Sequence, residues 1–283
     1  FKQDNVRRPI IKEEEVWRGN TVLLKRPDEG DKNDPGRLAQ THLEQVNVNR
    51  EFREVAEFLA QVRYLHVVPQ LIREPDRSVG KLRDPFGGDF LDQLARMQKE
   101  QKRTFDSRLR RINAALRVAV PQLKELTLDR DHAGKPHLRG LYEHWRREAG
   151  WQDEEQFSDG TLRLIGLLWA LLDGTGPLLL EEPELSLHEA LIRYLPAMMW
   201  KVSRKSGRQV IVSTHSAALL SDESIDAREV VLLRPTREDT EVTVAASDQE
   251  IRALVEGGVS IGEAVLPRVA PAGAEQLLLG FPE

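Results

Sequence analysis

FSDGTLRLIGLLWALL, residues 157–172, places a short polar segment directly before an almost unbroken apolar run. The apolar run predicts a helix that is buried on most of its faces. Ser158 can cap this helix, and Gly160 lets backbone amides approach a ligand closely. The N-terminus of a helix suits a phosphate, whereas the carboxylate of Asp159 would compete with such an anion. An ordinary helix cap therefore explains residues 158–161 by themselves.

Two strand-like runs follow, PLLLEEPE at 177–184 and QVIVSTHS at 209–216. Consecutive leucines predict a strand covered on both faces, and Glu181 and Glu182 come at its carboxyl end. Ligands of open α/β sheets bind beyond this end of the strands. A strand end that reaches solvent is the equal alternative, because adjacent carboxylates there need no ligand. His215 would lie beside the two glutamates if the strands are neighbours, although a lone histidine is usually structural.

The rest of the chain alternates between strand and helix patterns. Alternation after residue 157 predicts an α/β fold with a mainly parallel sheet. The expected elements, in order, are a hairpin at 9–25, an exposed loop at 26–40, a helix at 50–62, a buried strand at 62–68, helix at 90–119, a hairpin at 123–145, a helix near 187–205, a strand pair, a small helix at 248–256 and a short tail. Three segments follow from this order: 1–89, an inserted helical and hairpin subdomain at 90–150, and 151–283.

The expected helix at 90–119 has two contrasting faces. Its apolar residues recur at helical spacing, at Phe105, Leu109, Ile112 and Leu116. The opposite face is basic, and Arg108, Arg110 and Arg111 are its candidate contacts to DNA phosphates. A solvated helix face explains these arginines equally well.

The composition limits the classes of function. A hydrophobic fraction of 40% and a charged fraction of 31% suit a globular protein, and a net charge of −5 argues against a global basic field. The absence of cysteine excludes disulfides and thiolate metal sites, and it is compatible with a reducing compartment. No apolar run reaches the roughly 18–20 residues of a membrane span. We therefore expect a cytoplasmic protein without a membrane partner.

Taken in order, SDG, LLLEEPELSLH and VIVSTHS resemble three motifs of the ABC-type ATPases. The nearest branch contains the chromosome-maintenance (SMC), RecF-like and OLD-like AAA family ATPases, in which SDG often replaces SGG. The segments correspond to the signature loop, to Walker B with the D-loop, and to the switch histidine. The resemblance is strong over 157–216 and weak at 10–26. It implies a P-loop NTPase sheet of the ABC ATPase type that carries the inserted subdomain.

The resemblance also implies chemical roles. Glu182 would act as the general base on the attacking water, and His215 would sense the γ-phosphate of ATP. Glu181 would support Mg²⁺ through a water, at a position where the family usually has Asp. Gln70, after a strand and a proline, is a candidate Q-loop glutamine, and an ordinary loop glutamine is the alternative.

Other roles would be performed across a homodimer that sandwiches ATP. Four signature residues would meet the nucleotide of the partner subunit: Ser158, Asp159, Gly160 and Thr161. Four D-loop residues would contact the partner subunit: Leu185, Ser186, Leu187 and His188. We expect the carboxylate of Asp159 to point away from the phosphate, either capping the helix or meeting a basic group across the interface.

The chain has no G-x-x-x-x-G-K-[S/T] motif, which a P-loop needs to wrap and neutralise phosphates. We expect this P-loop to precede Phe1, and a degenerate ATPase is the alternative. The segment after His215 is too short for the Toprim nuclease of OLD-like proteins, so any nuclease is expected on a separate chain. The predicted function is an ATPase that drives a DNA-acting system in anti-phage defence or DNA repair. A transporter-type ATPase subunit and a non-hydrolysing adaptor are the alternatives.

Overall fold

A parallel three-stranded sheet carries the predicted motifs. In the computed structural model, β9 (Leu178–Glu181) is the middle strand, between β10 (Val210–Ser213) and β5 (Arg63–Leu65). Leu178 and Leu180 are buried, as expected for a strand covered on both faces. The predicted α/β fold with a parallel sheet is confirmed.

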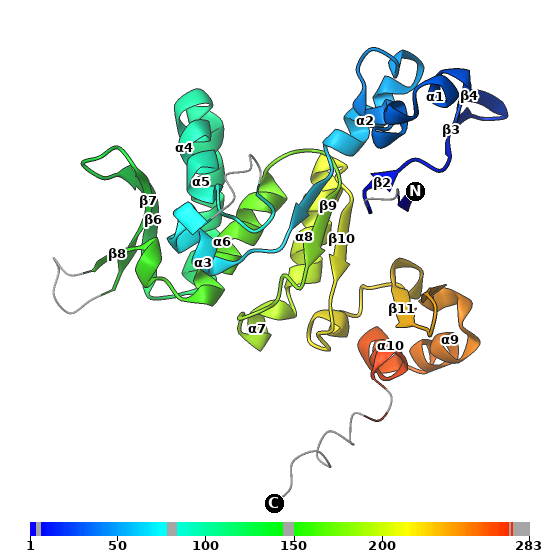
Figure 1. Ribbon diagram of the computed structural model, residues 1–283. Helices are drawn as coiled ribbons and strands as arrows, with labels where there is room; N and C mark the ends of the chain where they lie inside the picture. The colour runs from blue at the N-terminus through cyan, green and yellow to red at the C-terminus, as the bar shows by residue number, and fades with distance from the viewer. Residues whose placement is uncertain (4–6, 78–83, 144–149, 272, 274–283) are drawn as a thin grey trace, which may run out of the picture. The chain divides into compact units, whose positions relative to one another are not determined.

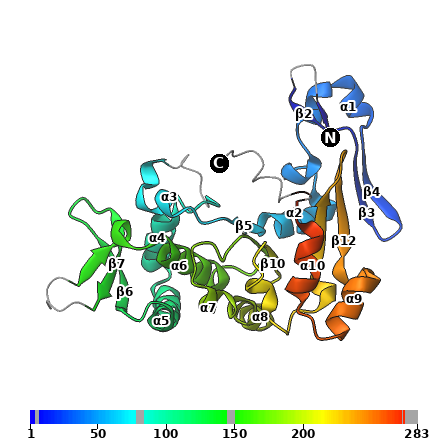
Figure 2. The same cartoon turned by 90° about the horizontal axis from the view of Figure 1, so that it is seen from below.

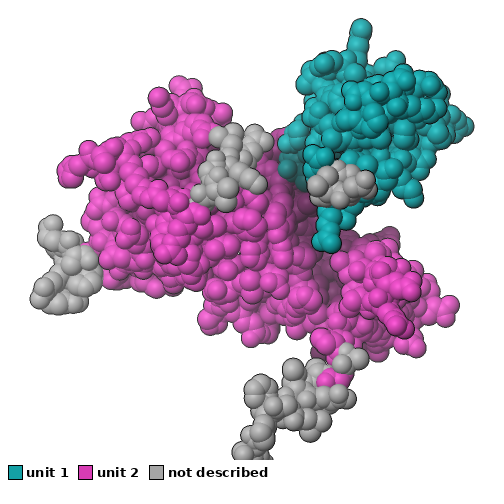
Figure 3. Space-filling model, in the orientation of Figure 1, with its two compact units in different colours: residues 1–62 teal, residues 63–283 magenta. Residues whose placement is uncertain are grey.

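The structure describes residues 1–3, 7–77, 84–143, 150–271 and 273. They form two compact units, Phe1–Val62 and Arg63–Glu283 (Figure 3). The sequence suggested a first boundary at 89–90, whereas the observed division lies immediately before β5. The reason is that β5 pairs with β9, more than a hundred residues later, so it belongs with the second unit.

The first unit consists of two antiparallel strand pairs and two short helices. Its elements are β1 (Lys2–Gln3), β2 (Pro9–Ile10), β3 (Glu14–Arg18), β4 (Thr21–Arg26), α1 (Glu29–Asn33) and α2 (Arg53–Ala60). β3 and β4 form the predicted hairpin, and Gly19 adopts a left-handed φ of 58° in its turn.

The prediction of an exposed loop at 26–40 is correct for the exposure of most of the segment, but not for α1 or for the buried Arg26 and Asp31. Arg26 is buried and donates to Asp31 at 2.9 and 2.8 Å and to Glu14 at 2.8 Å. The hydrogen bonds from Arg26 hold the pKa of Asp31 well below its usual range. The turn-rich composition correctly indicated part of a loop. It did not reveal the buried ion pair between Arg26 and Asp31.

The second unit begins with β5 and α3 (Pro69–Arg73) and continues with a helical and hairpin segment. Its elements are α4 (Phe90–Glu100), α5 (Lys102–Ala119), β6 (Leu123–Arg130), β7 (Pro136–Tyr142) and β8 (Trp151–Asp153). The single helix expected at 90–119 is broken at Gln101, and the expected hairpin is confirmed as β6 and β7. The short strand β8 adds a third strand to this sheet.

The helix α6 (Asp159–Leu172) contacts both α5 and α8 (Leu195–Ser206), as Figures 1 and 2 show. Nine of its residues are buried, as the apolar run predicted. The remaining elements are α7 (Glu189–Ile192), β11 (Val231–Pro235), β12 (Thr240–Val244), α9 (Gln249–Glu256) and α10 (Ile261–Val269). The predicted short tail is wrong over 261–269, because Ile261, Ala264 and Val265 are buried on one side of α10. Within the described residues, no helix is long and apolar enough to cross a membrane.

Candidate functional site

Glu181, Glu182 and the segment that carries His215 lie at the same edge of the sheet. In the parallel register of β9 and β10, Glu181 is opposite Ser213, and the amide of Glu182 donates to the carbonyl of Ser213 at 2.9 Å. His215 is exposed two residues beyond the end of β10. From the sequence, we expected His215 to lie beside the two glutamates if their strands were neighbours. The structure shows that β9 and β10 are neighbours.

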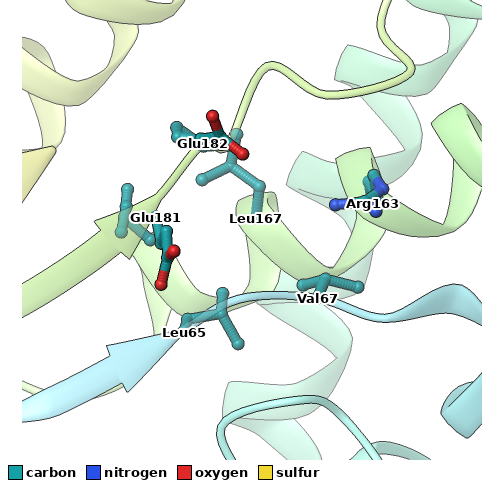
Figure 4. A pocket seen from close by; sticks show the side chains of 8 residues that line it. Leu65, Val67, Arg163, Leu167, Glu181 and Glu182 are labelled. Atoms are coloured by element: carbon teal, nitrogen blue, oxygen red, sulfur yellow. The ribbon is translucent and has the colours of Figure 1, made fainter. Parts of the chain in front are cut away.

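Glu182 is held in an uncommon backbone conformation. Its φ is 42°, in the left-handed region that a non-glycine residue adopts only when its surroundings impose it. Residues in such conformations cluster at functional sites. The chain turns after β9, and Glu181 and Glu182 both line a small hollow (Figure 4).

Arg163 of α6 lines the same hollow, and Figure 4 shows its guanidinium directed into it. Its Nε is buried and has no hydrogen-bond partner among the described residues. Burial lowers the pKa of this arginine, while the carboxylates of Asp159 and Glu182 act in the opposite direction. The site therefore combines two carboxylates with one incompletely paired cation. The only signal in the sequence was an arginine within an apolar run.

Glu181 has a partner that the sequence did not predict. The hydroxyl of Tyr64, on β5, donates a hydrogen bond to Oε2 of Glu181. This bond raises the pKa of Tyr64. Oε1 remains for a cation or its water, and hard carboxylate oxygens are what Mg²⁺ prefers. The described residues contain no group of three or more potential metal ligands, so a magnesium ion here would depend on substrate phosphates and water for its other ligands.

The N-terminus of α6 is capped as predicted. The Oγ of Ser158 accepts from the amide of Thr161 at 3.2 Å, and the two hydroxyls are 2.8 Å apart. Ser158 is exposed, but Thr161 is buried. A direct contact between the side chain of Thr161 and a nucleotide of another subunit is therefore not supported, since this hydroxyl is occupied inside the loop. Its observed contact is with Ser158.

Asp159 meets a basic group within its own chain. Its Oδ1 lies 2.7 Å from Nη2 of Arg73, which also donates to the carbonyl of Phe157 at 2.6 Å. The expectation of a basic partner is met, but the partner comes from α3 of the same chain. The ion pair explains how a carboxylate is accommodated next to a helix N-terminus that could bind an anion.

Gly160 is required by a contact inside the chain. A Cβ atom at this position would lie 2.3 Å from the carbonyl oxygen of Ser186. Real atoms do not approach so closely, so any other residue would push the start of α6 away from the predicted D-loop. This glycine therefore has a structural reason that is independent of a phosphate.

The predicted D-loop, residues 185–188, is a tight turn. The amides of Leu185 and Leu187 donate to the carbonyls of Glu182 and Glu184 at 3.1 and 3.0 Å. Ser186 has a left-handed φ of 63° and is exposed. The turn ends at His188, whose Nδ1 accepts from the amide of Ala190 and caps α7.

Glu184 was missed by the sequence reasoning. Its carboxylate is buried, and Oε1 accepts a hydrogen bond from the hydroxyl of Thr214, at the end of β10. The sequence feature that could have identified Glu184 is a third carboxylate, immediately after the proline of LLLEEPE.

The proposed basic face of α5 needs one correction. Arg108 is not on the exposed face, because it forms an ion pair with Asp173 at 2.6 Å and lies 5.5 Å from the ring centre of Trp169. Helical geometry places it nearer to the apolar side than the sequence suggested. Arg110 and Arg111 are exposed, and their contact with DNA stays a prediction.

Gln70 lies in the first turn of α3, shortly after the carboxyl end of β5. It is exposed. This position is at the same edge of the sheet as Glu181. The Q-loop assignment of Gln70 remains a prediction.

Comparison with known proteins gives a family and two structural likenesses. No curated protein matches the chain. One similar structure comes from work on ATP-driven dimerization and DNA-stimulated activation of SMC ATPases, with 14% identity, a TM-score of 0.40, and coverage of 55% of this chain and 94% of the other. An Smc head domain with a coiled coil and joint from Pyrococcus yayanosii also has 14% identity and a TM-score of 0.40, with coverage of 60% and 33%.

The family match covers most of the chain. Residues 15–221 match the AAA_21 family, described as "AAA domain, putative AbiEii toxin, Type IV TA system". This span contains the sheet β10-β9-β5, the helix α6 and the segment 185–188. The chain is therefore a member of the AAA_21 family of AAA-type ATPase domains, with an α/β P-loop NTPase fold.

Proposed function

We propose that this chain is the hydrolytic and dimerising part of an ATPase that closes as a homodimer around ATP. The observation that carries the proposal is the edge at which β9 and β10 end together. There the strained Glu182 hydrogen-bonds Ser213 through its backbone and lies beside the segment with His215. An α/β sheet with acidic and imidazole groups at its carboxyl edge suits phosphate hydrolysis.

Each residue has a defined task in this reaction. Glu182 takes a proton from the attacking water, and His215 hydrogen-bonds the terminal phosphate of ATP. Glu181, oriented by Tyr64, holds a water of the magnesium ion. Mg²⁺ supplies charge neutralisation at the phosphate oxygens. The reaction then depends mainly on positioning and on stabilisation of charge.

The dimer completes the site. Ser158 and the free amides at the start of α6 face the nucleotide of the partner subunit, where the positive end of the helix favours a phosphate. Asp159 is turned toward Arg73 and so does not oppose that phosphate. The exposed Ser186 belongs to the turn that meets the partner subunit.

ATP binding needs a P-loop, and the 283 residues contain no such motif. We place the P-loop on a segment outside these residues. Among the described strands, β10 pairs on one side only, with β9. Its free edge can accept the strand that leads into a P-loop, because an edge strand presents unpaired N–H and C=O groups.

The test compares Glu182→Gln with Glu189→Gln in a polypeptide that includes the P-loop. Glu182→Gln should reduce kcat by about 100-fold or more, because a general base contributes roughly 10²–10⁴-fold. ATP-dependent dimerisation should persist, since the amide keeps the shape of the side chain. Glu189 is exposed in α7 and pairs with Arg193, so its substitution should leave the rate unchanged. Equal rates for wild type and Glu182→Gln would overturn the assignment.

The second candidate is a non-hydrolysing adaptor with the same fold. The missing P-loop motif is the observation that favours it. An adaptor would show no ATP turnover in any natural form of the protein, whereas the proposed ATPase turns ATP over once the P-loop is present. Residues 1–283 alone should bind ATP poorly in both cases, so the longer polypeptide is the decisive sample.

The system served by this ATPase is proposed to act on DNA, with a separate nuclease or other effector chain, in the cytoplasm. The family description, which names a toxin and a type IV toxin–antitoxin system, supports a defence setting over a transport role. The exposed Arg110 and Arg111 are the proposed phosphate contacts. Their reversal to glutamate should weaken DNA binding and reduce its dependence on salt, whereas Lys135→Glu in the β6–β7 turn serves as a surface control. Unchanged affinity would remove α5 from the interface.

A further inference from the structure

Glu184 is a buried carboxylate to which the proposed reaction gives no role. Its side chain is only 7% exposed, and Oε2 has no hydrogen-bond partner among the described residues. A buried carboxylate with one partner is costly, so a simple space-filling side chain would serve packing better. Packing alone therefore does not explain a glutamate at this position. The contact through which Glu184 can act is its hydrogen bond with Thr214.

Thr214 is the centre of the turn that carries His215. Its hydroxyl donates to Glu184 and accepts from the amide of Ser216 at 2.9 Å. Ser216 continues the chain of bonds, because its Oγ accepts from the amide of Leu219 at 3.2 Å. His215 lies between two residues that are both fixed by this hydroxyl.

The other end of the link is the turn that contains Ser186. The carbonyl of Glu184 accepts from the amide of Leu187 at 3.0 Å, so Glu184 is itself part of this turn. The carbonyl of Ser186 in turn lies against Gly160 at the start of α6. One residue thus bonds the D-loop through its backbone and the histidine turn through its side chain.

We propose that Glu184 is a positioning residue that holds His215 in place by anchoring Thr214 and that makes the histidine turn and the D-loop move together. The assignment of His215 to phosphate sensing and of residues 185–188 to the dimer interface rests on the proposed function. The consequence is that a change at the dimer interface reaches His215 within the same subunit, through the side-chain hydrogen bond between Thr214 and Glu184.

The first test follows His215 directly and needs no nucleotide. The seven histidines are labelled with ¹³C, and the Cε1–Hε1 resonance of His215 is identified by its loss in His215→Gln. Glu184→Ala and Thr214→Val should both move this resonance. Both should also speed exchange of the Ser216 amide by about tenfold, as expected when a hydrogen bond that orders a turn is lost. The double variant should be no worse than Thr214→Val, because both changes break the same link.

Conservative variants separate positioning from general packing. Thr214→Ser keeps the hydroxyl and Glu184→Gln keeps an acceptor, so both should restore the wild-type resonance and exchange rate. The matched control is Thr236→Val, because Thr236 also donates to a carboxylate, that of Asp239, in an exposed turn between β11 and β12. This control should leave His215 unchanged. If Glu184→Ala does not fold, the Thr214→Val and Thr214→Ser pair carries the test alone.

An unmoved His215 resonance in folded Glu184→Ala or in Thr214→Val would overturn the proposal. So would failure of Thr214→Ser to restore it. In a polypeptide that hydrolyses ATP, Glu184→Ala should lower kcat by about ten- to a hundredfold with little change in KM, the expected cost of misplacing a contact in the transition state. A turnover-inactive wild type would refute the proposed function but leave the resonance result standing, so the two failures are distinguishable.

Discussion

The two ends of α6 are built in opposite ways. At its C-terminal end, the buried Arg208 donates from Nε to the carbonyl of Gly176 at 2.6 Å and from Nη1 to those of Ala170 and Asp173 at 2.5 and 2.7 Å. The carboxylate of Asp173 is paired with two more arginines, Arg63 and Arg108, at 2.9 and 2.6 Å. Cations are favoured at this negative end of the helix dipole.

At the N-terminal end, several groups are left available. Ser158 is exposed, Asp159 makes one ion pair with its side chain 41% exposed, and the Nε of Arg163 is buried without a partner in the described chain. Nη2 of Arg208 is also buried without a partner in the described chain, so one open nitrogen does not distinguish the two ends. The ends differ in that Ser158 and Asp159 are exposed where a nucleotide is proposed to bind, whereas Arg208 donates to backbone carbonyls at the other end.

The largest expected effect belongs to the C-terminal end. Arg208→Met should lower the free energy of unfolding by about 3 kcal/mol, because one buried and two part-buried hydrogen bonds from a charged donor to backbone carbonyls are lost. Urea denaturation followed by circular dichroism measures this change. Arg204→Met is the control, since Arg204 is exposed on α8 and stacks on Trp200. It should cost less than about 0.5 kcal/mol.

A small loss of stability for Arg208→Met would contradict the contrast between the two ends of α6. The C-terminal end would then contribute no more to fold stability than the N-terminal end. A loss of ATP turnover without any loss of stability would have the same consequence. The prediction is a global effect on folding that reaches activity only through the unfolded fraction.

Gly160→Ala tests whether the start of α6 and the D-loop are packed as one piece. The added methyl would meet the carbonyl oxygen of Ser186 at 2.3 Å, so one of the two segments must shift. We expect a cost of about 1–3 kcal/mol, the usual range for overpacking, together with loss of turnover. The control is Gly257→Ala at the end of α9, where the closest contact would be 3.2 Å, to the carbonyl of Ala253. Wild-type stability in Gly160→Ala would show that the contact is not restrictive.

A smaller and pH-dependent effect comes from the segment that leads into Ser158. His137, on β7, lies 2.8 Å from the buried Glu154 and 3.6 Å from Asp131. Burial lowers the pKa of His137, but hydrogen bonds and charge from Glu154 and Asp131 outweigh it, so the net pKa is raised. Glu154 begins the turn Glu154–Gln156 that leads into Ser158, so this cluster supports the N-terminal end of α6.

The sign of the pH effect follows from the raised pKa. The folded state binds the proton of His137 more tightly than the unfolded state, so this contribution is complete below about pH 6.5 and is lost as the pH rises through the folded-state pKa. Burial raises the pKa of Glu154 too, which gives a slope of the same sign from lower pH. Wild type should lose stability relative to His137→Gln as the pH rises from 6 to 8. Parallel pH profiles, measured by urea denaturation, would contradict this, and Lys135→Ala in the adjoining turn is the control.

Features that depend on local sequence were predictable. The cap at Ser158 and the buried run of α6 each follow from residues that are close together in the chain. Propensity and period-specific burial act over a few residues, so such patterns are visible without a structure. The acidic edge of the sheet was predicted only on the condition that β9 and β10 are neighbours, because Glu181 meets Ser213 across the two strands.

Features that depend on side chains meeting across the chain were not. Thr214 lies 30 residues from its partner Glu184, and Arg108 lies 65 residues from Asp173. The same limit applies to Arg26, whose buried pairs turned a loop-like composition into part of the core of the first unit. Spacing alone cannot show which charged residue will find a counter-ion, because that depends on the packing of distant elements.

The smallest expected effect belongs to Asp159, and it sharpens the N-terminal side of the comparison. Asp159→Asn should change the free energy of unfolding by at most about 0.5 kcal/mol, because exposed ion pairs contribute little. Its effect on nucleotide affinity is more informative. A carboxylate turned toward Arg73 does not oppose the phosphate, so ATP-dependent dimerisation, followed by light scattering against ATP concentration, should change by less than about twofold. Ser158→Ala, which removes the cap beside it, should weaken dimerisation more than Asp159→Asn does. If removal of the charge instead tightens dimerisation by about tenfold, the carboxylate faces the phosphate, and the ion pair with Arg73 is broken when the dimer closes.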